Sequence, residues 1–207
     1  MAPRRARPPR RPARCCATRC ASWPAAPGLR PLRDRALLLV GFAAALRRAE
    51  LVGLDVADLR PVPKGILLTL RRSKTDPDGA GTEVALPHGQ HELTCPVRAL
   101  AAWRAAAGLA DGAVFVSVTK GGRATATRLS DRDVARVVKA AVAAAGYDPA
   151  SFAGHSMRAG FATSAARAGV PEAAIMQQTR HRSAATLRGY VRRGGLFRDN
   201  AASKVGL

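Results

Sequence analysis

Arg47, Glu50, His155 and Arg158 are the residues whose types and spacing first indicate chemistry. Arg47 follows a long apolar run, and Glu50 comes one helical turn later, where its carboxylate can fix the guanidinium fork. Taken alone, such a pair is more commonly a structural ion pair on a helix surface. His155 and Arg158 form a His-x-x-Arg motif at the expected start of a helix, where backbone N–H groups favour an anion. The combination predicts a phosphate site rather than a metal site.

A second group of cations lies in the stretch Arg71-Arg72-Ser73-Lys74, on the expected tip of a β-hairpin. A lysine on such a loop, considered alone, is ordinarily a solvated charge. Its position in the sequence, between Arg47 and the His-x-x-Arg motif, makes Lys74 a candidate site residue.

Tyr190 follows His181 near the end of the chain, and a single tyrosine is more often a packing residue than a nucleophile. The acidic residues lie in expected turns and helix caps, whereas a two-metal nuclease needs several carboxylates that converge on its ions. We therefore predict no metal site and no cofactor. The chemistry that remains for breaking a phosphodiester is covalent attack by a side-chain hydroxyl.

The charge of the chain indicates a polyanionic partner. Its 207 residues carry 34 Lys+Arg against 14 Asp+Glu, which gives a net charge of +20. A surplus of this size fits a nucleic acid better than a small acidic metabolite. A membrane is the weaker alternative, because the longest apolar run, Ala36 to Leu46, is much shorter than the roughly 20 residues of a spanning helix.

The hydrophobic periodicity predicts an α+β fold that is mostly α-helical, with one small antiparallel sheet. Residues 1–30 mix Arg, Pro and Ala without periodicity, so we expect a disordered head before a single folded domain over 31–207. The expected strands are 65–70 and 83–87, and a short Val-Phe-Val segment lies near 115. The expected helices are 34–47, a short piece around Glu50, 96–107, 130–145, 155–168, 171–178 and 183–192.

The order Arg, Lys, His-x-x-Arg, His, Tyr resembles the catalytic domain of the tyrosine recombinase (phage integrase) family, over about residues 31–205. The resemblance implies that Arg47 and Arg158 clamp the scissile phosphate and that Tyr190 is the nucleophile. It also implies that Lys74 donates a proton to the leaving 5′-oxygen. It further implies that His155 is a proton acceptor, that His181 is a second pocket histidine and that Glu50 supports the first arginine. The implied contacts to the DNA backbone are Arg48, Arg71, Arg72, Ser73, Arg182 and Arg188.

The resemblance further implies site-specific recombination or integration of double-stranded DNA through a 3′-phosphotyrosyl intermediate, without metal or ATP. The enzyme would be a tetramer on two duplexes and a monomer away from DNA. It would work in the bacterial cytoplasm, at the nucleoid, for a mobile element, with no membrane partner.

Two departures from the family pattern lead to further expectations. Family members usually have a helical core-binding domain before the catalytic domain, which forms the other jaw of a DNA clamp, and we expect that domain to be absent from this chain. Where the family commonly has glycine before the second histidine, this chain has Arg180. A left-handed backbone at that position costs a non-glycine residue about 1–2 kcal/mol, enough to displace His181.

Three alternatives stay open at this point. The chain could be a DNA-binding integrase remnant without turnover, because it lacks its clamp. It could relax supercoils as a type IB topoisomerase does, with the same chemistry. It could also be an RNA-binding or ribosomal protein, which would explain the positive charge but would make the order of the pocket residues a coincidence.

Overall fold

The computed structural model describes residues 28–71, 81–152 and 156–181, together with 183, 185 and 187–189. Its helices are α2 Leu29–Ala43, α3 Arg48–Gly53, α4 Pro96–Ala107, α5 Asp131–Ala144, α6 Ser156–Arg167 and α7 Glu172–Thr179. Its strands are β1 Leu59–Val62, β2 Gly65–Leu70, β3 Thr82–Pro87, β4 Val116–Val118 and β5 Ala124–Arg128. Three 3₁₀ turns complete it: η1 Val56–Asp58, η2 Glu92–Thr94 and η3 Pro149–Ser151.

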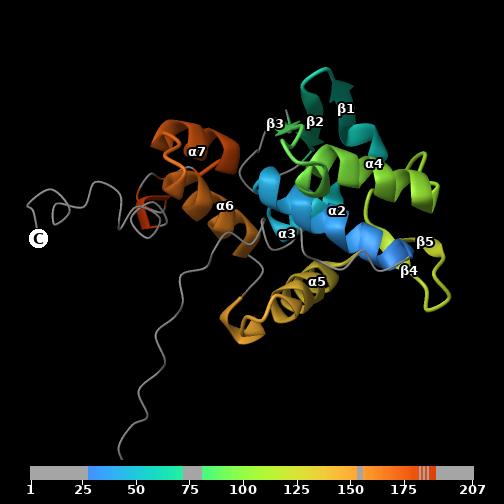
Figure 1. Ribbon diagram of the computed structural model, residues 1–207. Coiled ribbons are helices and arrows are strands. Elements are labelled where there is room, and N and C mark those ends of the chain that lie inside the picture. The colour runs from blue at the N-terminus through green and yellow to red at the C-terminus, as the bar shows by residue number, and fades with distance from the viewer. Residues whose placement is uncertain are drawn as a thin grey trace, which may run out of the picture.

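Helix α2 is the centre of the structure, and α3, α4, α5 and α6 all contact it (Figure 1). Its run Ala36–Val40 is buried on every side, which confirms the expectation of a buried helix. Across α2 the core continues to Trp103 of α4 and to Phe115, both fully buried. Helices α6 and α7 contact each other and lie together at one end of the molecule.

The predicted limits of this first helix, 34–47, are wrong. The helix starts at Leu29 and ends at Ala43, and Ala45 then adopts a left-handed backbone with φ 48°. The N–H of Ala45 donates to Phe42 O and that of Leu46 to Gly41 O, the hydrogen-bond pattern of a Schellman turn. Arg47 therefore lies in a turn between two helices rather than at the end of one.

The predicted hairpin is confirmed, and a third strand accompanies it. Strands β1, β2 and β3 form one antiparallel sheet in that order, with Leu68 paired to both Leu59 and Val84. Strand β1 contains Pro61, which a strand tolerates at the edge of a sheet, where a backbone N–H can be dispensed with. That proline is why the sequence pattern did not indicate a strand.

The expectation of one sheet is wrong for the described part of the chain, because β4 and β5 form a second antiparallel pair. Of the Val-Phe-Val segment, Val116 belongs to this pair, as the first residue of β4. Its partner, Ala-Thr-Ala-Thr-Arg, has no large apolar side chain to mark it as a strand.

The helix caps follow the sequence closely. Pro96 is the first residue of α4, and Ser130 and Asp133 form the capping box that begins α5. The expected helices 155–168 and 171–178 are α6 and α7. Of the expected helix 183–192, residues 183, 185 and 187–189 are described; 185 and 187–189 are helical and 183 is not.

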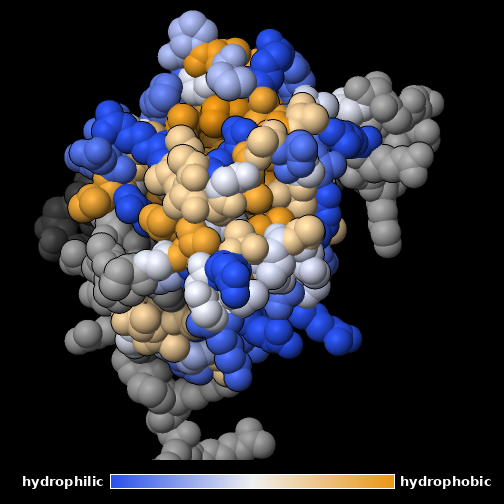
Figure 2. Space-filling model, turned by 90° about the vertical axis from the view of Figure 1, so that its right-hand side faces the viewer, coloured by the Kyte–Doolittle hydropathy of each residue, from blue (hydrophilic) through white to orange (hydrophobic). Residues whose placement is uncertain are grey.

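Figure 2 shows one face of the molecule, with apolar side chains in its middle and hydrophilic ones around them. The large hydrophobic residues that are exposed in the described segments are Leu93 and Val170. Among the helices of these segments, none combines the length and the hydropathy needed to cross a membrane.

Candidate active site

Arg47 and Glu50 are joined at the start of α3. Arg47 is the residue before the first turn of this helix, and its N–H donates to Glu50 Oε2 at 2.8 Å. Its guanidinium group also pairs with Glu50 Oε1. The predicted ion pair is therefore confirmed, but as a capping interaction rather than a pair on one helix face. The Arg47 side chain is 39% exposed and Glu50 only 4%, so the carboxylate is buried behind a guanidinium group that solvent reaches.

Glu50 also binds a second arginine, Arg180, whose Nη2 lies 2.8 Å from Glu50 Oε2. Burial by itself raises the pKa of Glu50, but the hydrogen bond from the Arg47 N–H and the charges of Arg180 and Arg47 outweigh burial. The pKa of Glu50 consequently lies below its usual value. Glu50 is thus a buried carboxylate ion that faces two guanidinium groups.

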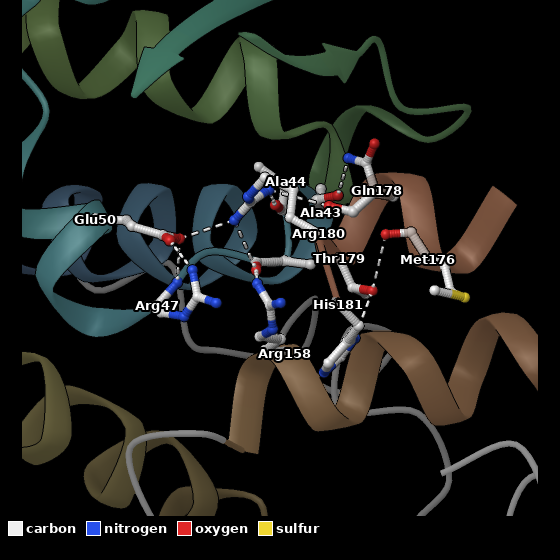
Figure 3. Close-up of polar contacts among 11 residues, drawn as sticks. Ala43, Ala44, Arg47, Glu50, Arg158, Met176, Gln178, Thr179, Arg180 and His181 are labelled. Atoms are coloured by element: carbon white, nitrogen blue, oxygen red, sulfur yellow. Dashed lines mark hydrogen bonds and ion pairs between the residues drawn. The ribbon is translucent and has the colours of Figure 1, made fainter. Parts of the chain in front are cut away.

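Arg158 approaches the same place from α6. It is 6% exposed, and its Nη1 donates to Ala45 O at 3.2 Å. Figure 3 shows the side chains of Arg47, Arg158 and His181 pointing into the same region. Three segments that are distant in sequence therefore contribute to one cationic site: the turn before α3, the start of α6 and the end of α7.

His181 is the second residue after α7, and Thr179 contacts its ring. Thr179 Oγ1 donates to Ile175 O at 2.6 Å and lies 2.7 Å from His181 Nδ1. Because a hydroxyl has a single hydrogen, the contact with the ring is assigned as Nδ1–H donating to Thr179 Oγ1. In the neutral ring this assignment places the lone pair on Nε2.

The pKa of His181 lies below its usual value. Burial lowers this pKa most, and the charges of Arg158, Arg47 and Arg180 lower it further. The ring is therefore mostly neutral at pH 7.

The phage integrase family model matches residues 24–194 of this sequence. The chain belongs to the phage integrase family. An integrase/recombinase xerD homolog from Selenomonas ruminantium is 42% identical over 174 residues, which are 84% of this chain and 51% of that protein. The chain thus spans about half the length of that curated relative.

Solved recombinase structures share the fold of this phage integrase family member. The XerH site-specific recombinase bound to palindromic difH substrate, in a post-cleavage complex, matches with a TM-score of 0.67 and 14% identity, over 91% of this chain and 49% of that one. The XerA recombinase matches with a TM-score of 0.65 and 20% identity, over 97% of this chain and 64% of that one. The predicted α+β, mostly α-helical fold class is confirmed, with two small antiparallel sheets among the described residues in place of the one expected.

Several predicted site residues of this integrase-family chain lie outside the described residues. They include the lysine, the first histidine, the tyrosine and three of the expected DNA contacts: Lys74, His155, Tyr190, Arg72, Ser73 and Arg182. Their roles stay predictions.

The other expected DNA contacts are described. Arg48 is the first residue of α3 and is half-buried. Arg71 pairs with Asp58 and, at 3.1 Å, with Asp55, so two carboxylates offset its charge. Arg188 lies 3.5 Å from Glu172. A DNA phosphate that binds Arg71 or Arg188 must compete with these acids.

Sequence reasoning noted Arg180 as a departure from the family pattern but did not recognise it as a member of the site. Its backbone is left-handed as expected, with φ 53° and ψ 41°. Thr179 was missed as well, since a threonine at the end of a helix carries no particular signal. In the described segments, no three His, Cys, Asp or Glu residues are grouped so that they could hold a metal ion.

Proposed function

We propose that this chain is the catalytic part of a site-specific DNA recombinase, which breaks and rejoins duplex DNA through a covalent bond to Tyr190. The observation that carries the proposal is the convergence of Arg47, Arg158 and His181 in one site, with Glu50 buried behind it. Membership of the phage integrase family and the order of the motifs support it.

The arrangement suits charge stabilisation at a phosphodiester. When an oxygen attacks phosphorus, negative charge grows on the nonbridging oxygens, and planar guanidinium groups can bind these bidentately. Arg47 is open to solvent, whereas Arg158 is fixed from behind by Ala45 O. Removal of one such pre-positioned donor typically raises the barrier by about 3–4 kcal/mol.

The proposed covalent step follows from residues whose roles rest on the resemblance. Tyr190 Oη attacks phosphorus and its proton passes to His155, while the departing 5′-oxygen takes a proton from Lys74. The product is a 3′-phosphotyrosyl bond and a free 5′-hydroxyl. Attack by the 5′-hydroxyl of a second strand reverses these transfers, reseals the DNA and releases the tyrosine.

His181 takes part as a ligand of the phosphate in this proposal. Burial lowers the pKa of His181 most and three arginine charges lower it further; the single negative charge of a phosphodiester bound among these arginines offsets part of their effect and raises the pKa. The ring then takes up a proton and donates Nε2–H to a nonbridging oxygen, while Nδ1–H stays on Thr179. Binding of DNA and protonation of His181 are therefore coupled.

The proposed partner is double-stranded DNA. Solved complexes that resemble this fold contain XerH with its difH substrate, and a lambda integrase dimer with a core site. For this chain we propose backbone contacts from Arg48, Arg72 and Arg182, and recombination by four protomers on two duplexes. A DNA substrate also places the protein at the bacterial nucleoid.

A covalent-trapping assay tests the proposal. The protein is incubated with nicked half-site duplexes that carry randomised core sequences, and denaturing gels detect a protein–DNA adduct. We expect an adduct with the unmodified chain and with Tyr147→Phe, and none with Tyr190→Phe. An adduct that survives Tyr190→Phe would refute the nucleophile.

The alternatives are separate outcomes of the same assay. DNA binding with no adduct on any duplex favours a DNA-binding module. An adduct together with relaxation of supercoiled plasmid, and no exchange between partner duplexes, favours topoisomerase-like activity.

A further inference from the structure

Arg180 is held in a conformation that costs free energy. Together with Ala45 it is one of the two non-glycine residues in the described segments that have a positive φ. A left-handed backbone costs a residue with a side chain about 1–2 kcal/mol, and such positions concentrate at functional sites. A glycine would adopt the same turn without this cost, but it would lack the hydrogen bonds that the Arg180 side chain makes.

The guanidinium group of Arg180 links two distant segments of the chain. Nη1 donates to Ala44 O at 3.2 Å and to Gln178 O at 3.0 Å. Nη2 donates to Ala45 O at 3.3 Å and to Glu50 Oε2 at 2.8 Å. The side chain is 14% exposed. The end of α7 is thereby fastened to the turn between α2 and α3.

Both fastened segments carry residues of the candidate active site (Figure 3). The turn between α2 and α3 leads into Arg47, and the end of α7 leads into His181. Ala45 O, in addition, accepts from Arg158 as well as from Arg180. One carbonyl group of a left-handed residue therefore sets the relative placement of two guanidinium groups.

Arg180 has no terminal donor to spare for a DNA phosphate. A guanidinium group has four N–H bonds on its two terminal nitrogens, and here four acceptors take them. The remaining donor, Nε, is buried and has no acceptor among the described residues. To bind a phosphate, Arg180 would first have to release the backbone carbonyls or Glu50.

We propose that Arg180 is a positioning residue, which fixes the distance between Arg47 and His181 by tying the end of α7 to Glu50 and to the carbonyls of Ala44 and Ala45. It stands behind the site and acts through its neighbours. This inference rests on the proposed function, because the geometry that it fixes is that of the phosphate site.

The test compares Arg180→Gly with Arg180→Lys and with a control, Arg136→Ala. Glycine relieves the left-handed backbone but removes all four hydrogen bonds, and lysine keeps the charge with only three donors and no planar fork. Arg136 lies on α5 in an exposed ion pair with Asp133, and its loss also removes one positive charge. Urea unfolding first establishes that each variant is folded.

Single-turnover cleavage of nicked half-sites and the Kd for the same duplex are then measured. We expect Arg180→Gly to slow cleavage about 100-fold, because a displacement of about 1 Å at a reacting group has an effect of this size. Its Kd should change no more than that of Arg136→Ala. The cleavage rate of Arg180→Lys should fall about 10-fold, because lysine lacks the planar fork of arginine. This variant carries the test if the glycine variant does not fold.

A second measurement needs no turnover. ¹⁵N relaxation of the Arg47 guanidinium and the His181 ring should show larger motion in Arg180→Gly than in the unmodified chain or Arg136→Ala. Cleavage by Arg180→Gly within threefold of the unmodified rate, or unchanged relaxation, would refute the positioning role. A loss in Kd as large as the loss in rate would make Arg180 a DNA contact. If the unmodified chain forms no Tyr190-dependent adduct, the proposed function is refuted. The ¹⁵N relaxation measurement would still decide whether Arg180 is a positioning residue.

Discussion

Replacement of Glu50 by glutamine probes the buried centre of the site. Glutamine has nearly the same shape, so Glu50→Gln removes a charge without opening a cavity. It leaves the Arg180 guanidinium group, 14% exposed, facing a neutral amide in place of its carboxylate. Loss of one partner from a buried ion pair typically costs 3–5 kcal/mol.

The lower end of that range is expected for Glu50→Gln. The amide oxygen can still accept from the Arg47 N–H, and the exposed Arg47 side chain can be hydrated instead. We therefore expect a loss of about 3 kcal/mol in the free energy of unfolding at pH 7. With an m-value of about 2–3 kcal/mol/M, the urea midpoint falls by about 1–1.5 M.

The stabilisation that the Glu50 carboxylate contributes should depend on pH. Because the pKa of Glu50 is lowered in the folded state, its stabilisation is present above the unfolded value near 4.5 and is lost as the pH falls through the folded pKa. The difference between the unmodified chain and Glu50→Gln should be full at pH 7 and shrink below pH 4.5.

Urea unfolding followed by circular dichroism, from pH 7 down to pH 3.5, measures this difference. The matched control is Glu83→Gln, in which an exposed ion pair with Arg60 is lost. Such a pair contributes about 0.5 kcal/mol or less. A midpoint shift for Glu50→Gln no larger than that of Glu83→Gln, or a shift that does not change with pH, would refute the assignment of Glu50 as a buried, doubly paired carboxylate.

Two more predictions concern the ring of His181 and the core under α4. The pKa of His181, below its usual 6.5 in the free protein, should rise when duplex DNA binds, so that affinity increases as the pH falls through the pKa of the bound state. An NMR titration of the imidazole with and without DNA measures this, and an identical pKa in both would contradict the proposed phosphate contact. Trp103→Phe should cost about 2–4 kcal/mol, because the buried Trp103 Nε1–H donates to Val114 O at 2.8 Å and a smaller ring leaves space. Urea unfolding measures the loss, and a change under 1 kcal/mol would show that the core repacks around the phenyl ring.

Local signals in the sequence predicted much of the fold. Pro96 and the capping box of Ser130 with Asp133 predicted the starts of α4 and α5, because caps depend on residues a few positions apart. The two strand-like runs 65–70 and 83–87, separated by a polar stretch that contains glycine, predicted the hairpin for the same reason. Strands β1 and β5 escaped notice, since a proline in one and small residues in the other give no such pattern.

The end of α2 shows where local signals fail. Ala44, Ala45 and Leu46 are good helix formers, so the pattern predicted that the helix continues to Arg47. Burial of Leu46 and the carbonyl contacts of Arg158 and Arg180 instead favour a left-handed turn at Ala45. Tertiary contacts outweigh a helix propensity that amounts to less than 1 kcal/mol per residue.

By itself the sequence determined which chemical groups are present and in what order, and this was sufficient to indicate the family and a cationic phosphate site. It also determined the Arg47 and Glu50 pair, because the two residues are near neighbours. Only the tertiary structure decided that α6 and the end of α7 meet the turn before α3, since that meeting depends on the packing of α6 against α2 and α7. It also decided the place of Arg180, whose partners lie far away in the sequence and are joined to it only when the core has formed.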